Sequence, residues 1–132
     1  METKFNLKSQ ICTTVEQSQR LLSLGLKKET ADMYYRFYNE NTYEINPTWE
    51  TIWEDRNDYK KIIPAWSLHR LIEMVQDVCS RIIMVHSWVR IENRCMPYID
   101  YPRDSFDNTY DNIIGCIEWL IKEGYFNKEY LV

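Results

Sequence analysis

The sequence contains few of the residues that build phosphate-binding loops, metal sites and disulfide frameworks. Its 132 residues include 3 Gly, 4 Pro, 4 Cys and 2 His. So few glycines exclude a glycine-rich loop whose backbone amides could cradle a nucleotide phosphate. The low glycine and proline content also excludes collagen-like and low-complexity chains.

The cysteines and histidines lack the close pairs from which structural zinc sites are usually built. We therefore expect no metal and no cofactor. The longest apolar run, Ile82–Val85, is far shorter than the roughly eighteen residues of a membrane span, so no membrane association is expected either. Because residues 1–7 show no secretory leader pattern, we expect reduced thiols and a cytoplasmic location.

Size, charge and composition are those of an ordinary globular domain. Hydrophobic residues make up 45% of the chain, charged residues 27%, and the net charge is −4. We expect a single domain over residues 1–132, with residues 1–11 as an extended or flexible N-terminus. The acidic balance argues against general binding to nucleic-acid phosphates.

Local signals predict the first helix over Thr14–Leu24. Two overlapping capping boxes could begin it, Thr13 with Glu16 or Thr14 with Gln17. The glycine after Leu24 suits a left-handed C-terminal cap, which would bring the following leucine back onto the last turn.

Two more helices follow from apolar residues at helical spacing. Ser67 can cap the second, whose apolar positions are Leu68, Leu71, Ile72 and Val75. The third is predicted to begin at Asp104 or Ser105 and to end at Gly124. Its apolar stripe consists of Phe106, Tyr110, Ile113, Ile114, Ile117, Leu120 and Ile121.

Strands are predicted between the helices, over Met33–Tyr38, Thr42–Ile45, Ile82–Ile91 and Cys95–Tyr101. Residues 46–62 are expected to form a surface loop. The order helix–β-hairpin–helix–β-hairpin–helix predicts an α+β single domain with a mostly antiparallel sheet and helices on one face.

Aromatic residues give the main functional signal, since they make up 14% of the chain. Rings occur on both faces of the first predicted hairpin, so either both faces are covered or one presents rings to a partner. Core packing explains the same rings equally well, and both interpretations stay open. The candidate binding residues are Tyr34, Tyr35, Phe37, Tyr38, Tyr43, Trp49 and Trp53.

Catalytic chemistry has weaker candidates. Cys95 could pair with His86 across the second hairpin, but a nucleophilic thiol needs a lowered pKa and an orienting group that no pattern here indicates. Carboxylates cluster twice, and general acid–base catalysis would need one of them in an apolar site. We predict no catalytic residue; a small enzyme with a Cys/His or carboxylate site is one alternative. The clusters are Glu40, Glu44, Glu50 and Glu54, and Asp100, Asp104, Asp107 and Asp111.

A nucleic-acid-binding accessory protein is the other alternative. It would use the arginines near the second hairpin for phosphates and neighbouring tyrosines for base stacking. The residues concerned are Arg90, Arg94, Arg103, Tyr98 and Tyr101.

Several blocks occur in a familiar order: Thr14–Ser18, Thr30–Tyr35, Ile63–Leu68 and Ile117–Ile121, the last followed by Gly124-Tyr125. With these blocks the chain resembles a group of small uncharacterised proteins carried by phages, prophages and mobile elements of gut anaerobes (Bacteroidales-type). The resemblance spans residues 12–126, and Pro-Ala-Trp-Ser-Leu is its most specific part. It implies a genomic setting and carries no site residues.

Together these observations predict a small accessory protein of a phage or mobile element that acts through protein–protein contact. The contact would use the aromatic region within residues 34–59. The partner is a protein, and a second copy of this chain joined through an exposed hairpin edge is included among the candidates.

Overall fold

The structure is a computed structural model that describes residues 9–48, 61–85, 87–93, 96–101 and 108–132. For residue 93 and residues 96–101 the structure describes the backbone alone. In chain order the elements are α1 (Val15–Ser23), the 3-10 turn η1 (Lys28–Thr30), β1 (Met33–Phe37), β2 (Tyr43–Pro47), β3 (Lys61–Ala65), α2 (Leu68–Gln76), β4 (Arg81–Val85), β5 (Trp88–Asn93), β6 (Met96–Tyr101), α3 (Thr109–Lys122) and the 3-10 turn η3 (Lys128–Tyr130).

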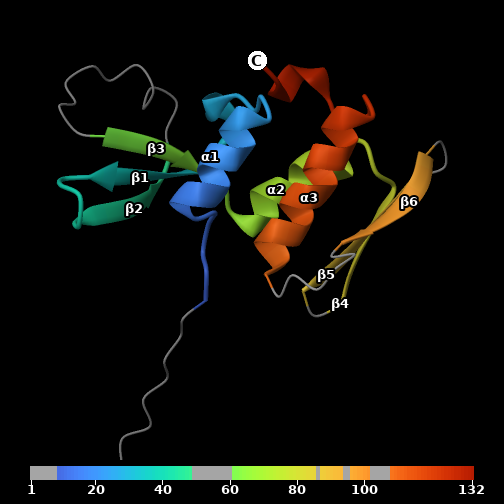
Figure 1. Cartoon of the computed structure of the whole chain (residues 1–132), viewed down its shortest axis with the longest axis horizontal. Coiled ribbons are helices and arrows are strands. Elements are labelled where there is room, and N and C mark those ends of the chain that lie inside the picture. Colours follow the sequence, from blue (N-terminus) through green and yellow to red (C-terminus); the bar gives the residue numbers. More distant parts are fainter. Residues whose placement is uncertain (1–8, 49–60, 86, 94–95, 102–107) are drawn as a thin grey trace, which may run out of the picture.

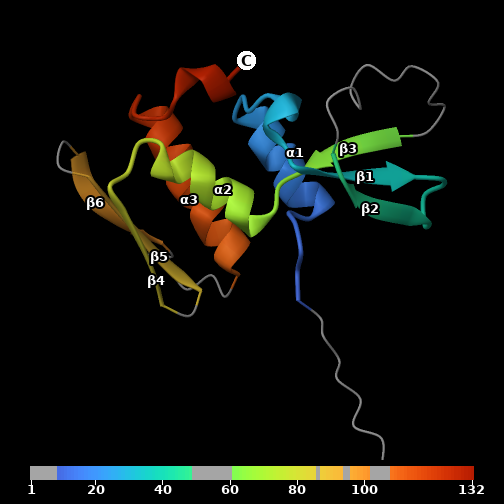
Figure 2. The ribbon, with the colours of Figure 1, turned by 180° about the vertical axis from the view of Figure 1, so that it is seen from behind.

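The strands form two separate three-stranded sheets, both antiparallel. The first has the order β2-β1-β3 and the second β4-β5-β6. The helices lie between the two sheets, with α1 beside the first and α3 against the second (Figures 1 and 2). This arrangement confirms the predicted α+β class.

Helix α1 begins and ends as its sequence predicts. Thr14 is the N-cap: its side chain accepts a hydrogen bond from the Gln17 amide, and the Gln17 side chain accepts one from the Thr14 amide. At the other end Gly25 has φ +104°, which a side chain would strain. The Leu26 amide donates to the Leu21 carbonyl over 3.2 Å, which completes a Schellman motif.

Helix α3 ends in the same way but begins later than predicted. Gly124 has φ +78°, and the Tyr125 amide donates to the Leu120 carbonyl over 2.8 Å. The N-cap is Asn108, whose side chain accepts from the Asp111 amide at 3.2 Å. The prediction of Asp104 or Ser105 as the start was wrong, since Asn108 caps the helix equally well and follows both in the chain.

Helix α2 confirms the prediction that Ser67 caps it. The Ser67 side chain accepts a hydrogen bond from the Arg70 amide at 3.1 Å. Asp32, just before β1, holds this cap in place, because its carboxylate accepts from both the Ser67 amide and the Ser67 hydroxyl. The start of α2 is therefore fixed to the first sheet.

The strands differ from the prediction in two places. The single strand expected over Ile82–Ile91 is two strands, β4 and β5, that pair with each other. The expected loop over residues 46–62 ends in β3, whose proline, Pro64, obscured it in the sequence. Each predicted hairpin is thus part of a three-stranded sheet.

Two hydrophobic clusters hold the described residues together. The main core joins the three helices to the inner face of the second sheet, where Val89 and Ile91 are fully buried. The small core lies under the first sheet and contains Cys12, Ile63 and Ala65. Among the described helices none is long and apolar enough to cross a membrane.

Candidate functional site

The predicted aromatic region separates into buried and exposed rings. Tyr34 and Tyr35 are buried, Phe37 is half-buried, and Tyr38 and Tyr43 are 41% and 51% exposed. The buried pair cannot contact a partner in the folded chain. The remaining candidates, Trp49 and Trp53, lie outside the described residues.

Three of these rings form a continuous ladder on one face of the first sheet. Tyr35, Phe37 and Tyr43 share that face because β1 and β2 are in register, with Phe37 opposite Tyr43. Their ring centroids are 5.2 to 6.0 Å apart, the usual range for packed aromatic pairs. The ladder runs from the small core to the surface.

Tyr35 anchors the buried end of the ladder. Its hydroxyl donates to the Thr13 carbonyl over 2.8 Å, and the Cys12 thiol lies 3.7 Å away as a donor to the same hydroxyl. Burial raises the pKa of Tyr35 well above its ordinary value, and the Cys12 contact adds to the rise. Burial likewise raises the pKa of Cys12. Both groups therefore serve packing in their protonated forms.

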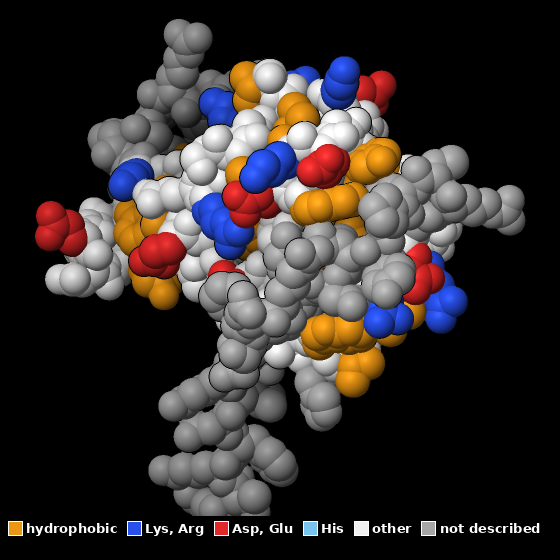
Figure 3. All heavy atoms as spheres, turned by 45° about the vertical axis from the view of Figure 1, so that its right-hand side comes forward, with side chains coloured by type: hydrophobic (Ala, Val, Ile, Leu, Met, Phe, Trp, Pro, Cys, Tyr) orange, Lys and Arg blue, Asp and Glu red, His pale blue; other side chains and the backbone are white. Residues whose placement is uncertain are grey.

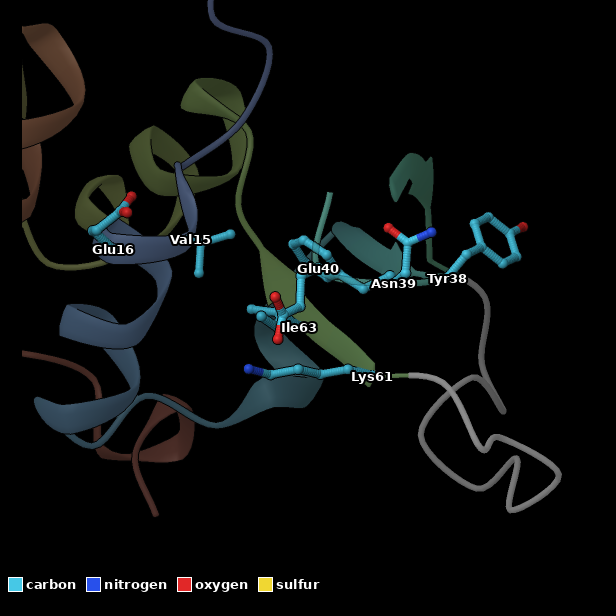
Figure 4. A pocket seen from close by; sticks show the side chains of 8 residues that line it. Val15, Glu16, Tyr38, Asn39, Glu40, Lys61 and Ile63 are labelled. Atoms are coloured by element: carbon cyan, nitrogen blue, oxygen red, sulfur yellow. The ribbon is translucent and has the colours of Figure 1, made fainter. Parts of the chain in front are cut away.

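Beside the exposed end of the ladder lies a cleft of about 560 Å³ between the first turn of α1 and the tips of β1 and β3 (Figure 4). Its apolar part is formed by Val15, Phe37 and Ile63. Around it lie five polar or charged side chains from three segments far apart in the sequence: Glu16, Tyr38, Asn39, Glu40 and Lys61.

Three charged side chains, Glu16, Glu40 and Lys61, lie at the rim of this cleft. Among the described residues, Glu16, Glu40 and Lys61 have no ion-pair partner. In Figure 4 the Lys61 side chain extends toward the cleft. Charges of both signs around an apolar floor are typical of a surface that recognises a polar partner with an apolar anchor.

The tip of the β1–β2 hairpin is a turn held by side-chain and backbone hydrogen bonds. The Asn39 side chain accepts hydrogen bonds from the amides of Asn41 and Thr42, at 2.8 and 2.9 Å. The Tyr38 amide donates to the Thr42 carbonyl over 2.9 Å. This Asx turn fixes the backbone that carries Tyr38 and Glu40 at the rim.

None of the described cysteines has the surroundings of a nucleophile. Cys12, Cys79 and Cys116 are buried, and burial raises the pKa of Cys79 to about 11. Burial thus opposes the thiolate form that attack requires. Cys95 and His86, the proposed pair, lie outside the described side chains.

Three of the candidate carboxylates can be placed. Outside the part of the chain that the structure describes lie Glu50, Glu54, Asp104, Asp107 and the side chain of Asp100. The two described members of the first carboxylate cluster, Glu40 and Glu44, are exposed. Asp111 accepts a hydrogen bond from Gln17 at 2.8 Å, in a contact between the N-termini of α1 and α3. Within the described part of the chain, no three metal-ligating side chains come together.

Of the predicted nucleic-acid contacts, one arginine can be placed. The Arg90 guanidinium lies over the Trp88 ring at 5.0 Å, on the second sheet. The side chains of Arg94, Arg103, Tyr98 and Tyr101 are outside the description, so this alternative stays a prediction.

Comparison with known proteins gives no relative. No family model, curated protein sequence or solved structure matches the chain.

The resemblance to phage and mobile-element proteins thus depends on its residue blocks alone, and these blocks have structural roles. Trp66 is fully buried and its indole N–H donates to the Thr30 hydroxyl over 3.0 Å. With the Asp32–Ser67 cap, this bond fixes α2 to the first sheet. These blocks therefore include the residues that connect α2 to the first sheet.

Sequence reasoning found the rings of this region and missed the cleft. Glu16, Glu40 and Lys61 each have an ordinary explanation as exposed charges, and nothing local connects them. These three side chains lie around one cleft because α1 packs against β3, which brings together positions more than twenty residues apart in the chain.

Proposed function

We propose that this protein acts by binding another protein, and that the cleft beside α1, together with the exposed rings of Tyr38 and Tyr43, is the docking surface. The observation that carries the proposal is the continuity between the apolar floor of the cleft and the ring ladder, which is bordered by charges of both signs. Tyrosine is enriched among the residues that dominate binding energy in protein interfaces.

Size and preorganisation support this proposal. A cleft of about 560 Å³ accommodates a few side chains of a partner segment. Because the hairpin tip is already fixed by its Asx turn, little conformational entropy would be lost on binding.

The biological setting is part of the same proposal. The residue blocks that resemble proteins of phages and mobile elements support an accessory protein of such an element, and a cytoplasmic location with reduced thiols is part of the proposal. The docking surface would then recognise a protein of the element or of its host.

A dodecapeptide library displayed on phage provides a direct test. We expect peptides enriched on the wild-type chain to share an apolar or aromatic anchor and a charged neighbour. A Tyr38→Ala/Tyr43→Ala double variant should weaken their binding at least tenfold, and Lys61→Glu should weaken peptides with a basic neighbour less than those with an acidic one.

Tyr125→Ala is the matched control, because Tyr125 is also exposed, at 39%, but stacks on Trp119 at the far end of α3. This variant should bind the selected peptides like the wild type. The proposal would be wrong if the library yields no enriched peptide, or if the enriched peptides bind the cleft variants as well as they bind Tyr125→Ala.

A further inference from the structure

The edge strands of the two sheets are protected unequally. A sheet edge presents unpaired backbone groups to any strand that comes near, and proline is one device that blocks this pairing. Three of the chain's 4 prolines lie in edge strands: Pro47 in β2, Pro64 in β3 and Pro97 in β6. Among the described edge strands, β4 is the one without a proline.

Other features that hinder edge pairing occur on the same three strands, β2, β3 and β6. β2 also carries the exposed charge of Glu44. At the end of β3 the Trp66 carbonyl accepts from the Thr13 amide at 2.8 Å, so the chain before α1 occupies part of that edge. The pairing of β6 with β5 is irregular between Ile91 and Asn93. β4 has an exposed charge only at its first residue, Arg81, and its described residues form a regular ladder with β5.

The side chains of β4 are apolar on both faces of the sheet, which suits pairing of its edge with another apolar strand. Ile82 and Met84 pack against the main core. The residues between and after them, Ile83 and Val85, lie on the opposite face of the sheet, and Val85 is 51% exposed. The one charge of the strand, Arg81, lies at its start and is 3.8 Å from Glu92 of β5.

The outer face of the second sheet continues this apolar edge. Val85 lies opposite Trp88 and Ile83 opposite Arg90 in the β4–β5 register. The Arg90 guanidinium covers the Trp88 ring. Figure 3, which turns this side of the molecule forward, shows hydrophobic side chains bordered by basic and acidic ones.

We propose that β4 is the self-association edge of this protein and that it pairs antiparallel with β4 of a second copy. A twofold axis at Ile83 places Ile82 of one copy opposite Met84 of the other, and Ile83 opposite itself. Val85 then lies opposite Arg81, so no like charges meet across the new pair. The two sheets join into one antiparallel sheet of six strands, twice the three of each copy.

The second copy is favoured over a foreign strand because the edge is complementary to itself. On the core side the new pairs are isoleucine with methionine, which continues the buried face of each sheet. On the outer side the two Ile83 side chains face each other at the twofold axis, and each is flanked on its own strand by Val85. Such an isologous contact closes on itself and leaves no free β4 edge for further growth.

Sedimentation equilibrium of the full chain over a hundredfold range of concentration tests the proposal. We expect a reversible dimer of twice the 16.1 kDa chain mass. Val85→Lys and Ile83→Lys should each raise the dimer dissociation constant at least tenfold. The first variant places a lysine opposite Arg81 of the other copy, and the second places two lysines opposite each other, so like charges meet in both. Val85 is exposed enough for its variant to fold even if Ile83→Lys does not.

Asn46→Lys is the matched control, since Asn46 is a half-buried residue of the edge strand β2. It should dimerise like the wild type. Hydrogen exchange gives an independent readout: the amides of β4 should exchange more slowly at high protein concentration, and those of β2 should not change.

Three results would overturn the proposal. The wild-type chain could sediment as a monomer at every concentration. Both β4 variants could dimerise with the affinity of the wild type. The concentration-dependent protection from exchange could appear at β2 in place of β4. None of these results bears on the peptide selection, which reports on the other sheet.

Discussion

The two sheets of this protein have the same strand number and the same antiparallel pairing, yet they are built for different surroundings. The second sheet gives its inner face to the main core, where Val89 and Ile91 are fully buried. The first packs on a small core of its own and presents a ring ladder and a cleft at its far end. The first sheet therefore contributes less to the shared core and more to the exposed surface.

This difference separates the residues that contribute most to stability from the proposed docking surface. Large apolar side chains that are fully buried lie mostly in the main core. The first sheet is attached to it by a few specific polar contacts, the Asp32–Ser67 cap and the Trp66–Thr30 bond among them. A surface on the first sheet can thus change with little effect on the main core.

Matched truncations in the two cores give the largest expected effect. Ile91→Ala should lower the free energy of unfolding by about 4 kcal/mol, and Ile63→Ala by about 2 kcal/mol, because the small core is shallower and can collapse around the lost methyl groups. Urea denaturation followed by circular dichroism measures both values.

Hydrogen exchange sharpens this comparison. Ile63→Ala should speed exchange mainly in β1, β2 and β3, whereas Ile91→Ala should speed it throughout the described core. Equal losses of stability, or a larger loss for Ile63→Ala, would show that the two clusters act as one core.

The parts of the fold that sequence analysis predicted are those encoded within a few residues. The capping box of Thr14 and Gln17 and the glycines after α1 and α3 act within one turn, so their geometry can be recognised in the sequence. The start of α3 was misplaced because several capping residues compete before Asn108.

Features that depend on distant contacts were missed. The strand β3 is short and contains Pro64, and only its pairing with β1 makes it a strand. The burial of Tyr34 and Tyr35 likewise depends on what covers each face, which ring content alone does not reveal. The cleft assembles side chains from α1, β1 and β3, and so has no local signature.

Alkaline pH should destabilise both cores, with an effect of intermediate size. In the unfolded chain Cys79 and Tyr35 ionise above about pH 9 and 10, whereas burial keeps both protonated in the folded chain. Their stabilising contribution is therefore complete below these pH values and is lost as the pH rises toward the folded pKa. Each group makes the free energy of unfolding fall by at most about 1.4 kcal/mol per pH unit.

Two variants separate these contributions. Cys79→Ala in the main core should remove part of the fall that begins at pH 9, to which buried Cys12 of the small core also contributes. Tyr35→Phe in the small core should remove part of the fall that begins at pH 10, to which buried Tyr110 of the main core also contributes. At pH 7 Tyr35→Phe should cost about 1 kcal/mol, because the Thr13 carbonyl loses its donor. Its deficit against the wild type should shrink as the pH rises; a constant deficit would contradict the buried, protonated state of Tyr35.

The smallest expected effect concerns an ion pair between the helices that adjoin the two sheets. Arg20 of α1 lies 2.5 Å from Glu118 of α3, but the two side chains are 41% and 46% exposed. Because water and salt screen exposed charges, a double-mutant cycle of Arg20→Met and Glu118→Gln should give a coupling of about 0.3 kcal/mol that vanishes in 1 M NaCl. A coupling above about 1 kcal/mol, or one insensitive to salt, would mean that this exposed pair holds α1 against α3. The two sheets would then be coupled more strongly than their separate cores imply.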